Sequence, residues 1–225
     1  MKRILKFIQA GLLAPIFLFA ATPVNAQSDS AVNLPNFLLP KFTKSVIKFK
    51  GGDAKSAIVN YNIIDEELVF VQDDTYMVLE DPQVIDTVYI GSRKLIPAKT
   101  GFYEIIENSP FSLVIRHKGY LEAITSANAY GVRSHTASTV YRKQFYGPAG
   151  TVNLKVPDNL QVVDNSEYMI SRDGSFEKFS SKRQFKKIFR EKEKELDKFF
   201  TENNINFQSL SDLINLLNYC NELYR

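Results

Sequence analysis

The residues with the clearest capacity for chemistry form an acidic run between Asp65 and Asp86. The run contains no basic side chain and eight acidic ones, which are Asp65, Glu66, Glu67, Asp73, Asp74, Glu80, Asp81 and Asp86. If 67–72 and 75–80 are strands joined at Asp73-Asp74, Glu67 lies opposite Glu80 and Glu66 lies opposite Asp81. Like charges that face each other across a hairpin are destabilising, so a further interaction should compensate them.

Three interactions could compensate this acidic hairpin end. The carboxylates could splay apart and hydrate, or they could dock against a basic run formed by Lys182, Arg183, Lys186, Lys187 and Arg190. Charges of −2 over 27–118 and +2 over 180–225 favour such docking. They could also bind calcium, which needs several oxygen ligands, although no EF-hand spacing is present. The candidate metal ligands are Glu66, Glu67, Glu80 and Asp81, and no other cofactor is expected.

The basic run itself is interleaved with acidic residues, which is typical of a solvated helix face. Besides internal docking, contact with anionic lipid headgroups is the alternative function for this face.

A second candidate site is the segment 120–150, which is rich in Ser, Thr, Ala and Gly. A stretch of this length without a regular pattern is usually functional or disordered. Aromatic and Arg side chains on a loop suit recognition of a glycan or a peptide. A poorly ordered excursion whose tyrosines partly pack on the sheet is the alternative. The candidate binding residues are Tyr120, Tyr130, Arg133, His135, Tyr141, Arg142 and Tyr146.

Common catalytic motifs are missing. The two histidines, His117 and His135, lie 18 residues apart, and neither a GxSxG elbow nor a Gly-rich phosphate loop occurs. The single cysteine, Cys220, excludes an intramolecular disulfide and an all-cysteine metal site, and its place on an apolar helix stripe predicts burial. We therefore assign no catalytic residue, and favour a non-enzymatic protein while leaving an enzyme open.

The first 26 residues have the pattern of an export signal. Lys2, Arg3 and Lys6 precede an apolar stretch over about 8–21, and Val24-Asn25-Ala26 predicts cleavage after Ala26. An uncleaved anchor is the alternative. Cleavage would leave no transmembrane span and place the protein in the periplasm, or at the outer envelope or outside, of a Gram-negative bacterium. Residues 27–225 hold 25 basic and 25 acidic side chains, so the net charge of +3 belongs to the signal and a nucleic-acid partner is not expected.

The remaining chain predicts an α+β fold in three parts. Residues 27–45 form an extended lead-in, 46–179 an antiparallel β-rich body, and 180–225 a two-helix hairpin packed on that body as part of one unit. Ser181 with Gln184, and Ser209 with Asp212, predict the two helix starts. Strands are predicted near 46–50, 57–64, 67–72, 75–80, 84–90, 94–97, 102–107, 111–118, 151–156, 168–172 and 175–179.

Several segments of the sequence resemble an uncharacterised family of exported proteins common in Bacteroidetes. They are YNIIDEELVF (61–70), VIDTVYIGSRKLIPAKTGFYEIIE (84–107), SLVIRHKGYLE (112–122) and FSSKRQFKKIF with LINLLNYC in the tail (179–220). The family has no assigned activity, so the resemblance implies export and a single-unit architecture but no catalytic residues. The expected function is a periplasmic or envelope binding or scaffolding module that contacts a protein, peptide or glycan through 120–150 or a sheet edge. A secreted hydrolase of envelope or nutrient polymers, with Glu66 and Glu67 as its carboxylate pair, is the alternative.

Overall fold

The computed structural model describes residues 34–124 and 154–225 of the chain, within a compact unit that spans Val32–Arg225. The rest of the candidate binding loop lies outside the described residues, and with it the candidates Tyr130, Arg133, His135, Tyr141, Arg142 and Tyr146.

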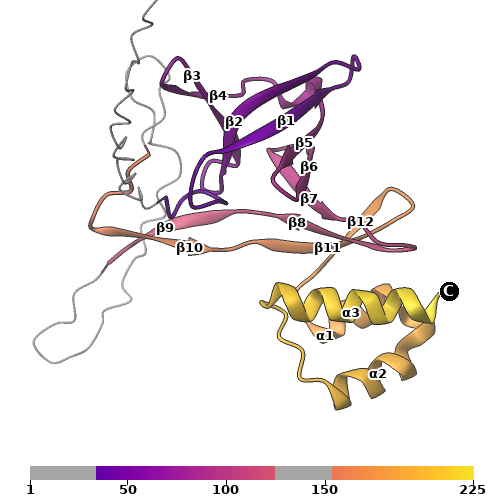
Figure 1. Cartoon of the computed structure of the whole chain (residues 1–225). Helices are drawn as coiled ribbons and strands as arrows, with labels where there is room; N and C mark the ends of the chain where they lie inside the picture. Colours follow the sequence, from indigo (N-terminus) through magenta and orange to yellow (C-terminus); the bar gives the residue numbers. More distant parts are fainter. Residues whose placement is uncertain (1–33, 125–153) are drawn as a thin grey trace, which may run out of the picture. The chain divides into compact units, whose positions relative to one another are not determined.

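Within the described residues, ten antiparallel strands form the main sheet, in the order β12-β11-β8-β7-β6-β5-β1-β2-β3-β4 (Figure 1). The fold is α+β, as the sequence predicts. All eight strands predicted between 46 and 118 are present, with ends shifted by a few residues. The strands are β1 (Thr43–Phe49), β2 (Ala54–Asn62), β3 (Glu67–Gln72), β4 (Thr75–Val78), β5 (Ile85–Ile90), β6 (Arg93–Pro97), β7 (Phe102–Ile106), β8 (Ser112–Arg116), β11 (Glu167–Arg172) and β12 (Ser175–Phe179).

Tight turns set the register of the predicted hairpins. Asp73 and Asp74 have φ values of 49° and 57°, and Asp173 and Gly174 have 49° and 79°. Two successive positive φ angles give the turn that matches strand twist. The β3–β4 ladder then pairs Val69 with Val78, as the sequence predicts.

A second, two-stranded sheet extends β8 and β11 into a longer ribbon. It pairs β9 (Gly119–Ala123) with β10 (Leu160–Asp164), and Asn165 N donates to Lys118 O at 2.9 Å where the two sheets join (Figure 1). Two sequence predictions are wrong here. The segment expected to be irregular from 120 begins with β9. Of the strand expected near 151–156, residues 151–153 lie outside the described residues and 154–156 form no strand, whereas β10, which was not predicted, follows a turn in which Leu160 N donates to Pro157 O.

One face of the sheet carries two hydrophobic clusters. The first lies on β1, β2, β3, β5, β6 and β7 and includes Tyr61, Val88 and Leu95. The second joins β8, β11 and β12 to the C-terminal helices and includes Leu113 and Phe185. The helical hairpin is therefore packed on the sheet, which is how it buries its apolar stripe.

The C-terminal region contains one helix more than predicted. The first predicted helix is divided into α1 (Lys182–Ile188), a 3₁₀ turn η3 (Arg190–Lys192) and α2 (Glu193–Glu202), while α3 (Leu210–Leu223) begins where the sequence predicts. A short 3₁₀ turn η1 (Pro82–Val84) precedes β5. The Ser181 hydroxyl accepts from Gln184 N at 3.4 Å, but the Gln184 side chain accepts from Ser180 N rather than from Ser181. Cys220 is buried, as predicted, and burial raises its pKa to about 12.

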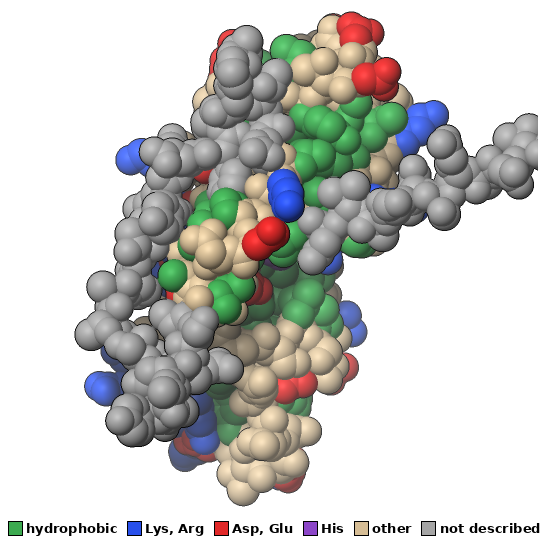
Figure 2. Space-filling view, turned by 90° about the vertical axis from the view of Figure 1, so that its left-hand side faces the viewer, with side chains coloured by type: hydrophobic (Ala, Val, Ile, Leu, Met, Phe, Trp, Pro, Cys, Tyr) green, Lys and Arg blue, Asp and Glu red, His purple; other side chains and the backbone are tan. Residues whose placement is uncertain are grey.

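The lead-in covers part of the opposite face of the sheet. Leu34 and Phe37 pack on Val69, and Phe42 contacts Tyr76 with ring centroids 4.8 Å apart. Large hydrophobic side chains remain exposed elsewhere, for example Ile58 at 48%. Figure 2 shows hydrophobic side chains reaching the surface among polar ones on one face of the molecule. No helix in the described ranges is long and apolar enough to cross a membrane.

Candidate functional site

The candidate site begins where the ribbon leaves the main sheet, at the ends of β8 and β11. Arg116 and Lys118 alternate along the chain and therefore share one face. Glu167 lies directly opposite Arg116 in the β8–β11 register, and Lys178 follows on the neighbouring strand β12. The antiparallel register thus places three cations around one carboxylate.

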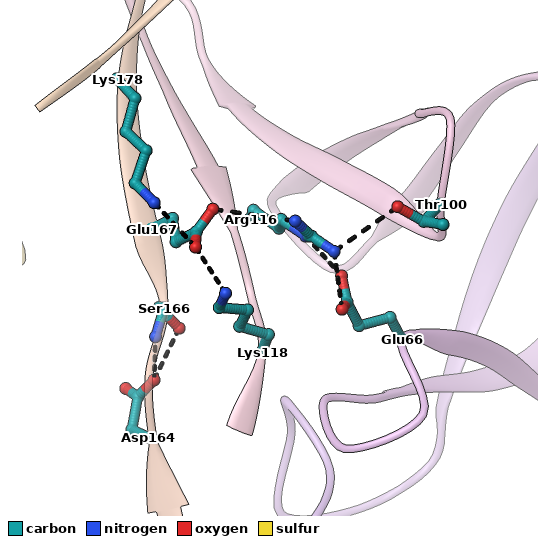
Figure 3. A network of polar contacts seen from close by, with 8 residues as sticks. All are labelled: Glu66, Thr100, Arg116, Lys118, Asp164, Ser166, Glu167 and Lys178. Atoms are coloured by element: carbon teal, nitrogen blue, oxygen red, sulfur yellow. Dashed lines mark hydrogen bonds and ion pairs between the residues drawn. The ribbon is translucent and has the colours of Figure 1, made fainter. Parts of the chain in front are cut away.

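These side chains form a continuous chain of charge-assisted contacts (Figure 3). Glu167 contacts Lys118 at 2.5 Å and Lys178 at 2.8 Å, and lies 3.8 Å from Arg116. On its other side Arg116 donates to both carboxylate oxygens of Glu66, from Nε at 2.6 Å and from Nη2 at 2.9 Å. Glu66 comes from the β2–β3 turn, so the network ties that turn to the ribbon.

The surrounding cations hold Glu167 in its ionised form. Burial alone would raise the pKa of this carboxyl, but the hydrogen bonds and charges of Lys118 and Lys178 outweigh burial and lower it to about 2. On the other side of the pair, the Glu66 carboxylate raises the pKa of Arg116, mainly through its hydrogen bond. Glu167 and Arg116 therefore stay charged at neutral pH.

A hollow of about 950 Å³ opens beside the network. Its charged walls carry both signs, from Asp65, Glu66, Glu67, Glu80, Lys99, Arg116 and Lys118. The partly exposed apolar side chains Ile64, Leu79 and Pro82, together with Tyr120, complete it. Ligand sites commonly have volumes of about 300–1,000 Å³ and combine apolar walls with a few placed polar groups. We call this hollow the charged groove.

Gly101 closes the charged groove against the protein body. It lies in the β6–β7 turn with φ +65°, and a Cβ at this position would lie 2.5 Å from both the backbone oxygen of Glu66 and the hydroxyl of Tyr61. The buried Tyr61 hydroxyl in turn accepts a hydrogen bond from Phe102 N at 3.3 Å. Only glycine permits this approach, so the turn position of Glu66 depends on it.

The structure brings together three of the four candidate metal ligands. Glu66, Glu67 and Glu80 line the charged groove, whereas Asp81 accepts a hydrogen bond from Gln83 N and caps the 3₁₀ turn before β5. Among the described residues, no group of three or more Asp, Glu, His or Cys side chains is arranged to hold a metal ion. The proposed calcium site stays a prediction without support from the geometry.

At the acidic hairpin end, β4 ends at Val78 and Glu80 and Asp81 are exposed, which agrees with the hydrated alternative, whereas Glu66 has a partner that none of the three interactions named. Glu66 pairs with Arg116 from β8, a residue that lies 50 positions away in the sequence. The basic run pairs within the helical region instead, because Lys186 contacts Asp197 and Glu193, each at 2.8 Å.

Of the candidate binding residues, Tyr120 lies in the described part and lines the charged groove. Four residues of the network, Arg116, Lys118, Glu167 and Lys178, were not predicted as site residues. The alternation of Arg116 and Lys118 along a predicted strand was a usable signal, but their pairing with Glu167 depends on a long-range register.

Comparison with known proteins gives no relative for this chain: no protein-family profile, no curated protein and no solved structure matches it.

Proposed function

We propose that the protein is a non-enzymatic binding module of the bacterial envelope, exported by its first 26 residues, that holds an extended peptide segment of a partner in the charged groove. The cationic start and the apolar stretch of the first 26 residues support the compartment. The groove supports the class of function, because three of its charged side chains, Glu66, Arg116 and Lys118, are held in ion pairs and face an open hollow of about 950 Å³.

One observation carries the proposal: Glu66 and Arg116, both on the groove wall, hold each other in a bidentate ion pair. Lys118, also on the wall, is held by Glu167, which lies beside the groove. Groups fixed in this way are suited to recognition, since a ligand meets charges that are already oriented.

The mixture of charges favours a peptide over a neutral glycan. Acidic and basic side chains on the groove walls complement a ligand that carries both signs, and complementary charge increases specificity. The partly exposed Ile64, Leu79 and Pro82 add apolar walls for side chains between those charges, and Tyr120 adds an aromatic one.

The test uses fluorescent nine-residue peptides that carry both acidic and basic side chains, with uncharged peptides as the negative probe. Lys99→Glu and Tyr120→Ala alter groove residues that take no part in the ion-pair network, and we expect each to weaken peptide binding about tenfold. Lys44→Glu and Tyr89→Ala, on β1 and β5 outside the groove, are the matched controls and should bind as the unaltered protein does. Equal binding by all four variants would contradict the groove, and cleavage of the peptides would support the hydrolase instead.

A further inference from the structure

The helical region carries a second concentration of charge that is independent of the charged groove. A hollow of about 470 Å³ is lined by Lys182, Arg183, Lys186, Lys187, Arg190 and Glu193. None of these residues lines the groove described above. Five cations and one carboxylate surround this hollow, which we call the basic hollow.

Only part of this positive charge is neutralised within the protein. Lys186 pairs with Asp197 and Glu193, and Lys182 lies 3.4 Å from Asp197 and over the Phe200 ring. The side chains of Arg183, Lys187 and Arg190 make no ion pair or hydrogen bond to any described residue. Arg183 and Lys187 lie four residues apart on one side of α1, and Arg190 follows in the 3₁₀ turn η3 after the helix has ended at Ile188.

Part of this charge is placed against local helix stability. Like charges three and four residues apart destabilise a helix by about 0.2–0.5 kcal/mol per pair, and Arg183 and Lys187 are such a pair. The first turn of α1 contains Lys182 and Arg183 and no acidic residue, although the positive end of the helix dipole favours acidic residues, whereas Lys186 and Lys187 lie in the last turn, where cations are favoured. Proteins tolerate charges that lower local helix stability mainly where those charges serve a function.

We propose that the basic hollow binds a phosphate group. Guanidinium groups match phosphate oxygens with paired N–H donors, and lysine adds a mobile positive charge. Arg183 and Arg190 supply the first kind of donor and Lys187 the second. A bound phosphate, with a charge of about −2 or less in magnitude, offsets part of the charge of the three uncompensated cations and reduces their mutual repulsion.

The test measures thermal unfolding of the purified protein with inorganic pyrophosphate. The variant R183Q/K187Q/R190Q removes the three cations, and K41Q/K44Q/K50Q removes the same charge from exposed lysines near β1. Pyrophosphate should raise the Tm of the unaltered protein and of the lysine control, and added salt should reduce this shift. The hollow variant should bind pyrophosphate about tenfold or more weakly. Without pyrophosphate, its Tm should equal or exceed that of the unaltered protein, because repulsion is removed.

A second arm distinguishes the source of the phosphate. If the unaltered protein sediments with phosphatidylglycerol vesicles but not with phosphatidylcholine vesicles, and the hollow variant does not sediment with either, the phosphate belongs to a lipid headgroup. A pyrophosphate shift without vesicle binding identifies a soluble phosphorylated ligand. Three results would each overturn the proposal. The first is that the unaltered protein shows neither a pyrophosphate shift nor vesicle binding. The others are a loss of binding in the lysine control equal to that in the hollow variant, and a Tm of the unliganded hollow variant below that of the unaltered protein.

Discussion

The substitution Gly101→Ala tests how the charged groove is held together. A Cβ at Gly101 would lie 2.5 Å from the backbone oxygen of Glu66 and 2.5 Å from the Tyr61 hydroxyl. Neither atom can withdraw freely, because one belongs to the backbone of the β2–β3 turn and the other is on a fully buried side chain. The methyl group must therefore displace the turn that carries Glu66.

Two costs combine at this position. The left-handed conformation of an alanine costs about 1–2 kcal/mol, of which the reduced freedom of the unfolded chain returns about 0.4–1 kcal/mol. Overpacking of a tight site adds about 1–3 kcal/mol. We expect Gly101→Ala to lower the free energy of unfolding by about 2–4 kcal/mol, and a domain of this size loses roughly 2–4 °C in Tm per kcal/mol.

Gly91 provides a matched control in the neighbouring β5–β6 turn. Its φ is +60°, close to the +65° of Gly101, but a Cβ there would meet nothing within 4 Å. Gly91→Ala should therefore cost only about 1 kcal/mol, from the backbone alone. Urea unfolding followed by tyrosine fluorescence measures both variants, since the chain contains no tryptophan. Equal losses in the two variants would refute the close approach and the closing role assigned to Gly101.

Three further predictions concern the rest of the structure. Asn221→Ala on α3 should cost about 2–4 kcal/mol of unfolding free energy, because the Asn221 side chain hydrogen-bonds both the N–H and the carbonyl of buried Phe111. Asn218 is exposed and hydrogen-bonds Asn108, so Asn218→Ala should cost under about 1 kcal/mol. The pKa of Glu167 in the folded protein lies below its ordinary 4.5, so the stability that its carboxylate contributes is complete above pH 4.5 and is lost as the pH falls toward 2. The difference in unfolding free energy between the unaltered protein and Glu167→Gln should therefore shrink over that window. A difference that stays constant during acid unfolding would contradict the lowered pKa. The Cys220 thiol should react with a disulfide reagent at pH 8 only after denaturation, and rapid labelling of the native protein would show that its burial is wrong.

Much of the local structure could be predicted because short-range signals specify it. The Asp73-Asp74 and Asp173-Gly174 turns have the positive φ angles that their residue types favour, and they determine the hairpins around them. The Ser209 cap and the apolar face of α3 likewise lie within a few residues of each other. Each of these features depends on residues close in the sequence, which periodicity and turn chemistry describe.

The charged groove could be predicted only in part, since it depends on contacts between distant segments. The acidic run pointed to Glu66, and its need for a compensating partner was correct. The partner itself could not be identified, because Arg116 lies 50 residues away and its orientation follows from the order of the strands. Glu167 is more distant still, and it reaches the site through the β8–β11 register.

The division of the first predicted helix has a similar explanation. Its apolar stripe is continuous in the sequence, but Phe185 and Phe189 must both pack into the cluster that also holds Leu196. The chain meets this requirement by forming a 3₁₀ turn after Phe189 and then resuming the helix at Glu193. Periodicity shows which residues are buried, whereas the shape of the cluster determines where the helix bends.

Amide chemical-shift mapping with the tightest of the mixed-charge peptides tests the central claim most directly. The account predicts that the largest shifts lie at the amides of Gly101, Lys118 and Gly119, which line the charged groove. Shifts confined to the free edge strand Ser175–Phe179 or to the helices 182–223 would contradict it, because the peptide would then bind away from the groove.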